Sequence, residues 1–216
     1  MGTERESSIR TEMEEGCRRL GIMLNRSQLE AFLTYRELLL EWNRRVNLIS
    51  RKDEGRIVAH HFLDSLVSFP HLDLSLGKRL LDLGSGAGFP GVPLKIVAPQ
   101  IRLTLLDSKR KRVLFLRKLV NVLQLEDVNV LCERAEHLGK QEGYTGKFDY
   151  VVARAVMELN RLVVLALPFL RRGGRLIAYK GPDEVTEAQG MIADVSMRGV
   201  RVSFPKERDL VIVEKM

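Results

Sequence analysis

Cysteine is scarce in the chain, and long apolar runs are missing from it. Two of the 216 residues are cysteines, Cys17 and Cys132, and they lie far apart without a C-x-x-C partner. This pattern excludes a disulfide framework and favours reduced cytoplasmic thiols. No apolar stretch reaches the roughly 18 residues that a membrane helix needs. The charged N-terminal stretch also lacks the apolar segment of a signal peptide, so we expect a cytoplasmic protein that does not enter a membrane.

Clusters of metal ligands are missing as well. The chain has four histidines, and none has metal-ligand spacing with a cysteine or a carboxylate; they are His60, His61, His71 and His137. We therefore expect no bound metal ion. With 45% hydrophobic and 29% charged residues, the composition is that of an ordinary globular protein. The length suits one domain with a small appendage, and we expect a monomer.

Positive charge, by contrast, is abundant. The formal net charge is +7 and the isoelectric point is near 9.6, which favours a polyanionic partner because Lys and Arg neutralise phosphates. The basic residues form short clusters among structured segments, at 44–45, 51–52, 109–112, 117–118 and 171–172. This distribution favours a folded surface shaped for nucleic acid. The alternative is a set of basic faces that are merely solvated.

The first third of the chain has helical periodicity, from about Thr11 to Phe69. Ser27 is expected as an N-cap, with Glu30 completing a capping box three residues later. Apolar residues then recur at spacings of three and four up to about residue 49, as in an amphipathic helix. A second helix is expected over Asp53 to Ser68.

After Pro70 the pattern changes to short apolar runs that alternate with helical segments. The runs are KRLLDL, IRLTLLD, DVNVLC, FDYVVA, GRLIAYK and DLVIVE. Such runs predict a doubly wound α/β fold with a mostly parallel sheet that is covered on both faces. The segment VRVSFPKERDLVIVE predicts a C-terminal antiparallel hairpin. We thus expect a helical region over 1–70 and an α/β domain over 71–216, with its ligand at the carboxyl ends of the strands.

The segment LLDLGSGAGFPGVPLK, residues 80–95, contains two glycine patterns. Gly86, Gly88 and Gly91 fit the G-x-G-x-x-G of a dinucleotide site, whereas Gly84, Gly86 and Gly88 fit G-x-G-x-G. Asp82 distinguishes the two, because a carboxylate beside the first glycine would repel a pyrophosphate. S-adenosylmethionine carries a sulfonium and an ammonium group, so a nearby acid favours it, either directly or by fixing the loop.

Two proline residues in this segment, Pro90 and Pro93, fit poorly with a helix that starts inside the glycines, although proline is tolerated in a first turn.

Two further acidic positions agree with a nucleoside ligand. Asp107 ends the second expected strand, where a carboxylate accepts hydrogen bonds from ribose hydroxyls. Glu136, or a backbone group after the third strand, is placed to read the amino edge of adenine. The order of acid, glycine turn, acid and acid predicts S-adenosylmethionine as the cofactor, with Gly86 among its contacts. An NAD-dependent oxidoreductase is the rival interpretation of the glycines.

Motifs that are missing from the sequence narrow the choice of the atom that accepts the methyl group. The D/N-P-P-Y/F loop of amino-methylating enzymes is absent after the fourth strand, which reads VVARAV, and no cysteine follows a proline as in pyrimidine C5 methylation. Guanine N7 has an in-plane lone pair and needs no base, only positioning against the sulfonium. We therefore assign no catalytic residue. Lys180 is the group that could serve an oxygen nucleophile instead.

Seven segments, in order, resemble one known family: WNRRVNLIS, HHFLDSL, LLDLGSGAGFPGVPLKI, LLDSKRKRVLFL, ERAE, VVARAV and AYKG. The likeness is to the bacterial 16S rRNA guanine-N7 methyltransferases, RsmG or GidB, from about Leu29 to Val213. It implies a class I (Rossmann-like) methyltransferase fold and a cytoplasmic enzyme that modifies 16S rRNA of the 30S subunit. Matching motifs imply cofactor contacts at Gly84, Phe89, Ala135, Glu136 and Arg154.

The RNA contacts are expected among polar and basic residues: Arg44, Asn47, His61, Lys180 and Arg208. For Asn47 and His61, a buried structural role is the alternative, and for Arg208 a solvated loop charge. Two other functions remain open at this point. One is a methyltransferase that acts on another rRNA base or on a protein. The other is a catalytically silent RNA-binding factor that keeps the fold as a scaffold.

Overall fold

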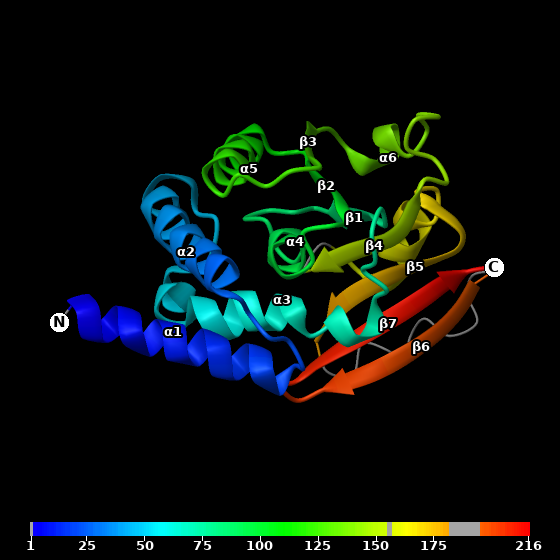
Figure 1. Cartoon of the computed structure of the whole chain (residues 1–216). Coiled ribbons are helices and arrows are strands. Elements are labelled where there is room, and N and C mark those ends of the chain that lie inside the picture. Colours follow the sequence, from blue (N-terminus) through cyan, green and yellow to red (C-terminus); the bar gives the residue numbers. More distant parts are fainter. Residues whose placement is uncertain (1, 155–156, 182–194) are drawn as a thin grey trace.

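The computed structural model describes residues 2–154, 157–181 and 195–216, in which a helical N-terminal part precedes an α/β part (Figure 1). The helices are α1 (Gly2–Arg19), α2 (Arg26–Val46), η1 (Arg51–Arg56), η2 (Val58–Leu63), α3 (Asp64–Leu66), η3 (Phe69–His71), α4 (Gly91–Val97), α5 (Arg110–Val122), α6 (Ala135–Leu138) and α7 (Leu159–Ala166). The strands are β1 (Arg79–Leu83), β2 (Arg102–Asp107), β3 (Val128–Cys132), β4 (Phe148–Arg154), β5 (Leu170–Lys180), β6 (Val195–Val202) and β7 (Arg208–Lys215).

The start of α2 differs from the prediction by two residues. The N-cap is Asn25 and not Ser27: the backbone of Asn25 is extended and its Oδ1 accepts from Gln28 N at 2.9 Å. The side chain of Gln28 accepts in return from Asn25 N at 3.0 Å, so the capping box is Asn25–Gln28. Ser27 donates its hydroxyl hydrogen to Asn25 Oδ1 instead. Asparagine is at least as good an N-cap as serine, which explains the shift.

The second predicted helix, 53–68, is helical but divided. A 3-10 turn (η1) is followed by a π-helical segment (η2) and a short α-helix (α3). In the π segment the N–H of Asp64 reaches back to the carbonyl of Ala59, which widens the helix. This widening rotates the side chains after residue 58 relative to an ideal α-helix.

The sheet confirms the predicted α/β class. Its strand order is β3-β2-β1-β4-β5-β7-β6; β1 to β5 are parallel, and β7 runs antiparallel to both β5 and β6. The predicted C-terminal hairpin is therefore present as β6 and β7. The chain leaves β1 toward its neighbour β2 on one side and leaves β4 toward its neighbour β5 on the other side. The carboxyl ends of β1 and β4 are therefore the switch point where ligands bind in such sheets.

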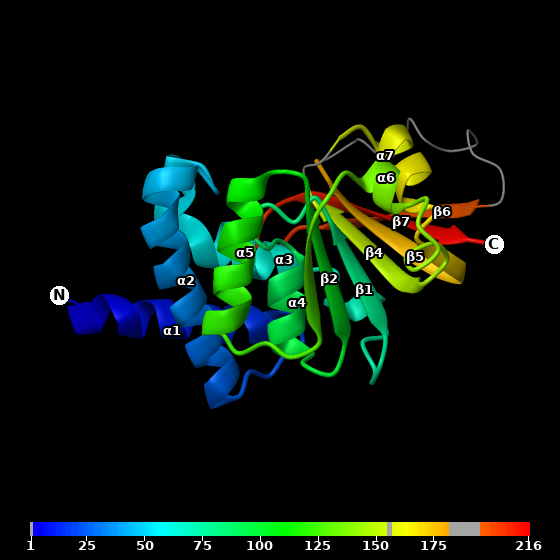
Figure 2. The same cartoon turned by 90° about the horizontal axis from the view of Figure 1, so that it is seen from above.

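Successive side chains of each central strand enter two different cores, as the period of a strand requires. Leu80 and Val152 join a core with α2, α4 and α5, whereas Leu81 and Val151 join a core with α7. Figure 2 shows α4 and α5 on one side of the sheet and α6 and α7 on the other. Both faces are thus covered, as the continuous apolar runs predict.

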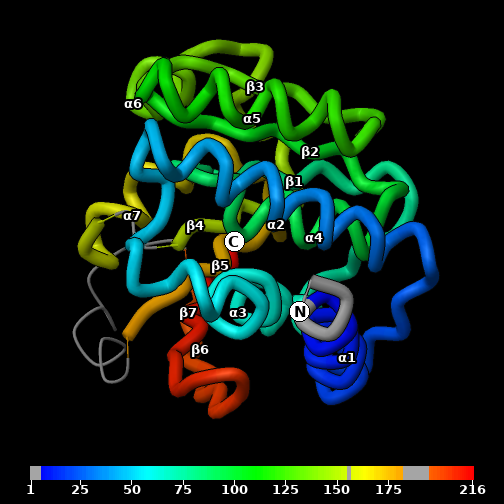
Figure 3. Tube along the Cα trace, turned by 90° about the vertical axis from the view of Figure 1, so that its left-hand side faces the viewer, coloured from blue at the N-terminus to red at the C-terminus, as the bar shows by residue number. Residues whose placement is uncertain are grey.

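The helical N-terminal part shares the first of these cores. Met13 of α1, Phe32 of α2 and Phe62 of η2 are buried in the same cluster as the strand residues. Figure 3 shows α1 and the α3 segment lying beside each other. A Cβ on Gly16 of α1 would lie 2.2 Å from Leu63, so glycine allows this close approach. The division into two domains at residue 70 stays a prediction. In the structure, the N-terminal helical segments end at His71 and the first strand begins at Arg79.

Candidate functional site

The glycine segment forms a tight turn between β1 and α4 at the carboxyl edge of the sheet. Gly84, Gly86 and Gly88 have positive φ angles of 75°, 58° and 96°, which residues with a side chain rarely adopt. The N–H groups of Gly84 and Ser85 both donate to the carbonyl of Leu106 on β2, at 2.8 and 3.0 Å. The turn is therefore fixed to the strand beside it before any ligand binds.

Helix α4 begins at Gly91, the last glycine of the G-x-G-x-x-G pattern. The expectation that Pro90 and Pro93 disfavour such a helix start is wrong. Pro90 takes the N-cap position and Pro93 lies in the first turn, where helix N–H groups have no intrahelical partner. Both glycine patterns describe the same turn, so the choice of ligand depends on the groups around it.

Asp82 lies beneath this turn and is fully buried. Its Oδ2 accepts a hydrogen bond from Gly91 N at 2.9 Å, and a Cβ at position 91 would lie 2.7 Å from that oxygen. Burial raises the pKa of this carboxyl to about 7. Its Oδ1 has no hydrogen-bond partner among the residues that the structure describes. Asp82 thus fixes the turn through one oxygen and keeps the other for an additional donor.

Asp107 joins the turn to the start of α5. Its Oδ2 accepts from Gly86 N at 2.9 Å and lies 3.4 Å from Arg112 Nη1, while its Oδ1 accepts from Lys109 N at 2.8 Å. The side chain is 4% exposed and borders a cavity of about 240 Å³. The same cavity is lined by Gly84, Ala135 and Glu136. The structure therefore brings together four of the residues predicted to contact the cofactor.

The aromatic ring in the turn, Phe89, is buried and supports it from the side of the helical region. It stacks with Tyr35 of α2 at a centroid distance of 5.4 Å and with His61 of η2 at 5.0 Å. The Tyr35 hydroxyl donates to the carbonyl of Ala87 inside the turn. Sequence reasoning missed Tyr35, because an apolar helix face does not show which of its residues carries a hydrogen bond to another element.

A buried carboxylate, Asp64, gathers three cations beside Phe89. Arg208 binds Asp64 through two bonds, with Nε 2.6 Å from Oδ1 and Nη2 2.9 Å from Oδ2. Arg154 Nη1 lies 2.9 Å from the same Oδ2, and Lys206 Nζ lies 3.5 Å from it. The guanidinium of Arg154 also lies 4.7 Å from the Phe89 ring centroid. Sequence reasoning missed Asp64. The sequence feature that could have identified it is an acidic residue within the apolar stretch FLDSLV.

His61 adjoins this cluster as a neutral imidazole. Burial, reinforced by the charge of Arg154, lowers its pKa to about 3. Arg154 Nη2 lies 3.2 Å from His61 Nδ1, and because an arginine can only donate, Nδ1 is the acceptor and Nε2 carries the proton. His61, Arg154 and Arg208 therefore lie together next to the glycine turn. For His61, both the RNA-contact and the structural interpretation remain compatible with this position.

Two of the remaining predicted RNA residues, Arg44 and Asn47, lie at the end of α2. Arg44 is exposed in the last turn of α2, and Asn47 is the exposed C-cap of that helix, with a φ of 49°. The buried asparagine is Asn43, whose side chain donates to Glu54 and accepts from Ile49 N. The buried, hydrogen-bonded role considered for Asn47 therefore belongs to Asn43. Asn47 suits the C-cap position because asparagine tolerates the left-handed conformation better than most residues.

Lys180 and Arg208 occupy the ends of β5 and β7. Lys180 is 8% exposed and its Nζ donates to the carbonyl of Met157 at 2.6 Å. Arg208 is the first residue of β7 and its side chain is 12% exposed in the pair with Asp64. The interpretation of Arg208 as a solvated loop charge is therefore wrong.

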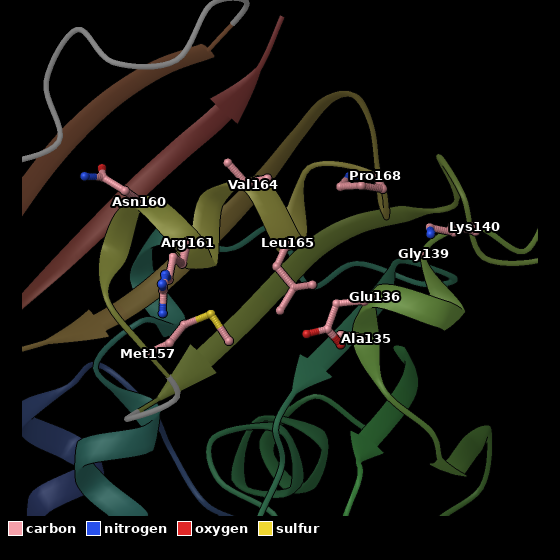
Figure 4. A pocket seen from close by; sticks show the side chains of 10 residues that line it. All are labelled: Ala135, Glu136, Gly139, Lys140, Met157, Asn160, Arg161, Val164, Leu165 and Pro168. Carbon is pink, nitrogen blue, oxygen red and sulfur yellow. The ribbon is translucent and has the colours of Figure 1, made fainter.

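A second, larger cavity of about 700 Å³ lies between α6 and α7 (Figure 4). It shares Ala135, Glu136, Met157 and Leu165 with the cavity beside Asp107, so the two cavities adjoin.

No group of three or more histidine, cysteine or acidic side chains could hold a metal ion within the described part of the chain. Within that same part, no helix is long and apolar enough to cross a membrane.

The family model described as "rRNA small subunit methyltransferase G" (GidB) matches residues 28–210. The chain belongs to this family. A "Ribosomal RNA small subunit methyltransferase G" from Alkaliphilus metalliredigens is 40% identical over 213 residues, which cover 94% of this chain and 89% of the relative. The protein of the same name from Roseiflexus castenholzii is 44% identical over 207 residues, 91% of this chain and 87% of the relative.

Solved structures with the same fold are more distant. A mutant of MtNAS in complex with S-adenosylmethionine superimposes with a TM-score of 0.55 at 18% identity, over 83% of this chain and 72% of the other. A SAM-dependent methyltransferase from Aquifex aeolicus gives 0.53 at 21% identity, over 71% of this GidB-family chain and 90% of the other. These likenesses confirm the predicted class I methyltransferase fold.

Proposed function

We propose that this GidB-family protein transfers a methyl group from S-adenosylmethionine to N7 of a guanine in 16S rRNA of the small ribosomal subunit. The observation that carries the proposal is the cavity at the carboxyl ends of β1 and β2. There, Gly84, Asp107, Ala135 and Glu136 surround a space next to a turn fixed by Asp82. The relatives are named as methyltransferases of small-subunit rRNA, and that substrate belongs to the cytoplasm.

The residues of this site suit S-adenosylmethionine better than a dinucleotide. A buried carboxyl lies under the turn, and one of its oxygens has no partner among the described residues; it would oppose a pyrophosphate and favour a cation. Asp107 would accept from the ribose hydroxyls, and Ala135 and Glu136 would read the adenine edge. Gly84, Gly86 and the turn around Phe89 would hold the methionine part, with Arg154 fixing that turn from its far side. When bound, the cofactor supplies an electrophilic methyl group on its sulfonium.

The histidine beside the turn, His61, does not supply a base for the methyl acceptor. His61 is held neutral with its proton on Nε2, and its Nδ1 is occupied by Arg154, so it has no free lone pair to accept a proton. Guanine N7 already carries an in-plane lone pair. The protein then has only to hold that nitrogen in line with the methyl group, which is catalysis by orientation. We accordingly assign no catalytic residue.

The decisive experiment identifies the modified atom. The protein is incubated with labelled S-adenosylmethionine and 30S particles that lack methylation, and the RNA is treated with borohydride and then aniline. N7-methylguanosine has a labile glycosidic bond, so cleavage at one guanine is expected. A methyl group that resists this treatment and lies on a ribose or an exocyclic amine would refute the N7 assignment. Absence of any transfer, with RNA still bound, would favour the silent RNA-binding factor.

Asp107→Ala is expected to weaken S-adenosylmethionine binding by about 1–3 kcal/mol, because charge-assisted hydrogen bonds to the ribose are lost. Asp107→Asn keeps an acceptor for Gly86 N and separates the loss of charge from loosening of the turn. Isothermal titration measures the affinity, and Glu126→Ala, an exposed acid before β3, is the control. Unchanged affinity in both Asp107 variants would remove this residue from the site.

Asp82 should make cofactor binding depend on pH. With a pKa of about 7, its carboxyl is half protonated near neutrality, and a cationic ligand lowers that pKa by favouring the ionised form. Binding should therefore release protons, and affinity should rise between about pH 6 and 7.5. Titrations in two buffers of different ionisation enthalpy measure the release. Asp82→Asn should abolish it; an unchanged release would mean that another group titrates.

Reversing the charge of Arg44 and Arg45 is expected to weaken RNA binding and flatten its salt dependence. Both side chains are exposed at the end of α2, and each lost phosphate contact lowers the salt slope by about 0.7. The control is reversal of Arg171 and Arg172 at the amino-terminal end of β5, where Arg171 also pairs with Asp149 at 2.8 Å. Cofactor affinity should stay constant. Equal slopes for the two double variants would show that Arg44 and Arg45 are merely solvated.

A further inference from the structure

The larger cavity adjoins the proposed adenine site through shared walls. Ala135, Glu136, Met157 and Leu165 line both the cavity of about 240 Å³ beside Asp107 and the cavity of about 700 Å³ between α6 and α7. The larger one has the volume of a small-molecule site. It exists because α6 ends after a single turn, at Leu138, and covers little of this face of the sheet.

One wall of the larger cavity is apolar. Figure 4 shows Met157 and Leu165 extending from the α7 side toward α6, opposite Glu136, and Val164 and Pro168 continue the apolar wall. Val164 is 63% exposed although it is apolar. The polar side chains that line this cavity are Glu136, Lys140, Asn160 and Arg161. The apolar wall opposite Glu136 suits an apolar substituent.

We propose that this cavity is an extension of the adenine site that admits adenosyl ligands with an apolar group on the adenine amino nitrogen. The inference rests on the proposed function, in which Glu136 faces the amino edge of adenine. A single substituent on that nitrogen leaves one N–H for Glu136 and directs the added group past Glu136 into the larger cavity. Two substituents remove the hydrogen-bond donor, and such ligands are excluded.

The test compares S-adenosylhomocysteine with its N6-benzyl and N6,N6-dibenzyl derivatives by isothermal titration of the full chain. The N6-benzyl compound should bind about three- to tenfold tighter than the parent, because apolar area is removed from water, and the dibenzyl compound should bind more weakly than the parent. Val164→Glu places a charge on the exposed apolar wall. It should remove the gain from the benzyl group while the parent compound binds within about twofold of wild type.

Leu114→Glu is the control, because Leu114 is an exposed leucine on α5, on the other side of the sheet. It should leave all three affinities unchanged. Equal or weaker binding of the N6-benzyl compound overturns the inference, as does a gain that persists in Val164→Glu. If Val164→Glu instead raises the KM for 30S particles, the cavity receives RNA and the inference is again wrong. Failure of the parent compound to bind would refute the cofactor assignment itself.

Discussion

Asp64→Ala is expected to destabilise the folded protein by about 3–5 kcal/mol, the usual cost of removing one partner from a buried ion pair. Asp64 is fully buried, and it is the carboxylate that balances Arg154, Lys206 and Arg208 among the described residues. Without it, three cations would remain close together in a poorly solvated space. Two of them, Arg154 and Arg208, are only 11% and 12% exposed and cannot turn freely into water.

Urea unfolding measures this loss, with the fluorescence of Trp42, the one tryptophan of the chain, as the signal. Asp73→Ala is the matched control, because Asp73 forms an exposed pair with Lys78 at 3.4 Å and such pairs contribute at most about 1 kcal/mol. A loss below about 1 kcal/mol in Asp64→Ala would show that the cluster does not stabilise the fold.

The effect of Asp64 should also depend on pH. Burial alone would raise the pKa of its carboxyl, but the nearby Arg154 and Arg208 outweigh burial and hold the pKa below its ordinary value. A depressed pKa in the folded state means that the stabilisation is present near neutrality and is lost as the pH falls below about 4. The difference in stability between wild type and Asp64→Ala should therefore shrink in acid.

Gly88→Ala is expected to destabilise the protein by about 2–5 kcal/mol and to weaken cofactor binding, because it disturbs the turn itself. Gly88 has a φ of 96°, and a Cβ there would lie 2.6 Å from the Tyr35 hydroxyl and 3.0 Å from Val92. Backbone strain and overpacking thus act together. Gly77→Ala isolates the first effect, since Gly77 has a φ of 80° but no atom of the described residues within 4 Å of an added Cβ.

Both variants are compared by urea unfolding and by titration with S-adenosylmethionine. Gly77→Ala should lose about 1–2 kcal/mol of stability and retain its cofactor affinity. Adding Tyr35→Phe to Gly88→Ala removes the hydroxyl oxygen that lies closest to the new methyl group, and should restore part of the lost stability. Equal losses in Gly88→Ala and Gly77→Ala would show that the contact with Tyr35 does not matter.

The features that the sequence predicts well are those that local pattern determines. The continuous apolar runs identified β1, β2, β4 and β7, because a strand buried on both faces must be apolar at almost every position. Asp107 was found because it ends such a strand. The N-cap of α2 was misplaced by two residues, since Asn25 and Ser27 are both good caps and only the backbone conformation chooses between them.

The features that sequence reasoning missed depend on contacts between distant segments. Asp64 meets Arg154 and Arg208, which lie 90 and 144 positions away in the chain. The π-helical turn before Asp64 changes which side chains of this segment share a face, and no periodic pattern announces it. The cationic cluster forms because the helical region packs against the carboxyl end of β4 and the first residue of β7.

One helix, α2, makes contact with the glycine turn through Tyr35 and ends at the exposed Arg44 and Arg45. These two regions lie about nine residues apart on a continuous helix, or about 14 Å. Under the proposed function, α2 therefore connects the RNA contact at Arg44 and Arg45 to the carbonyl of Ala87 in the glycine turn. Energetic linkage between two ligands is reciprocal. If RNA at the basic end of α2 changes the affinity for the cofactor, bound cofactor must change the affinity for RNA by the same factor.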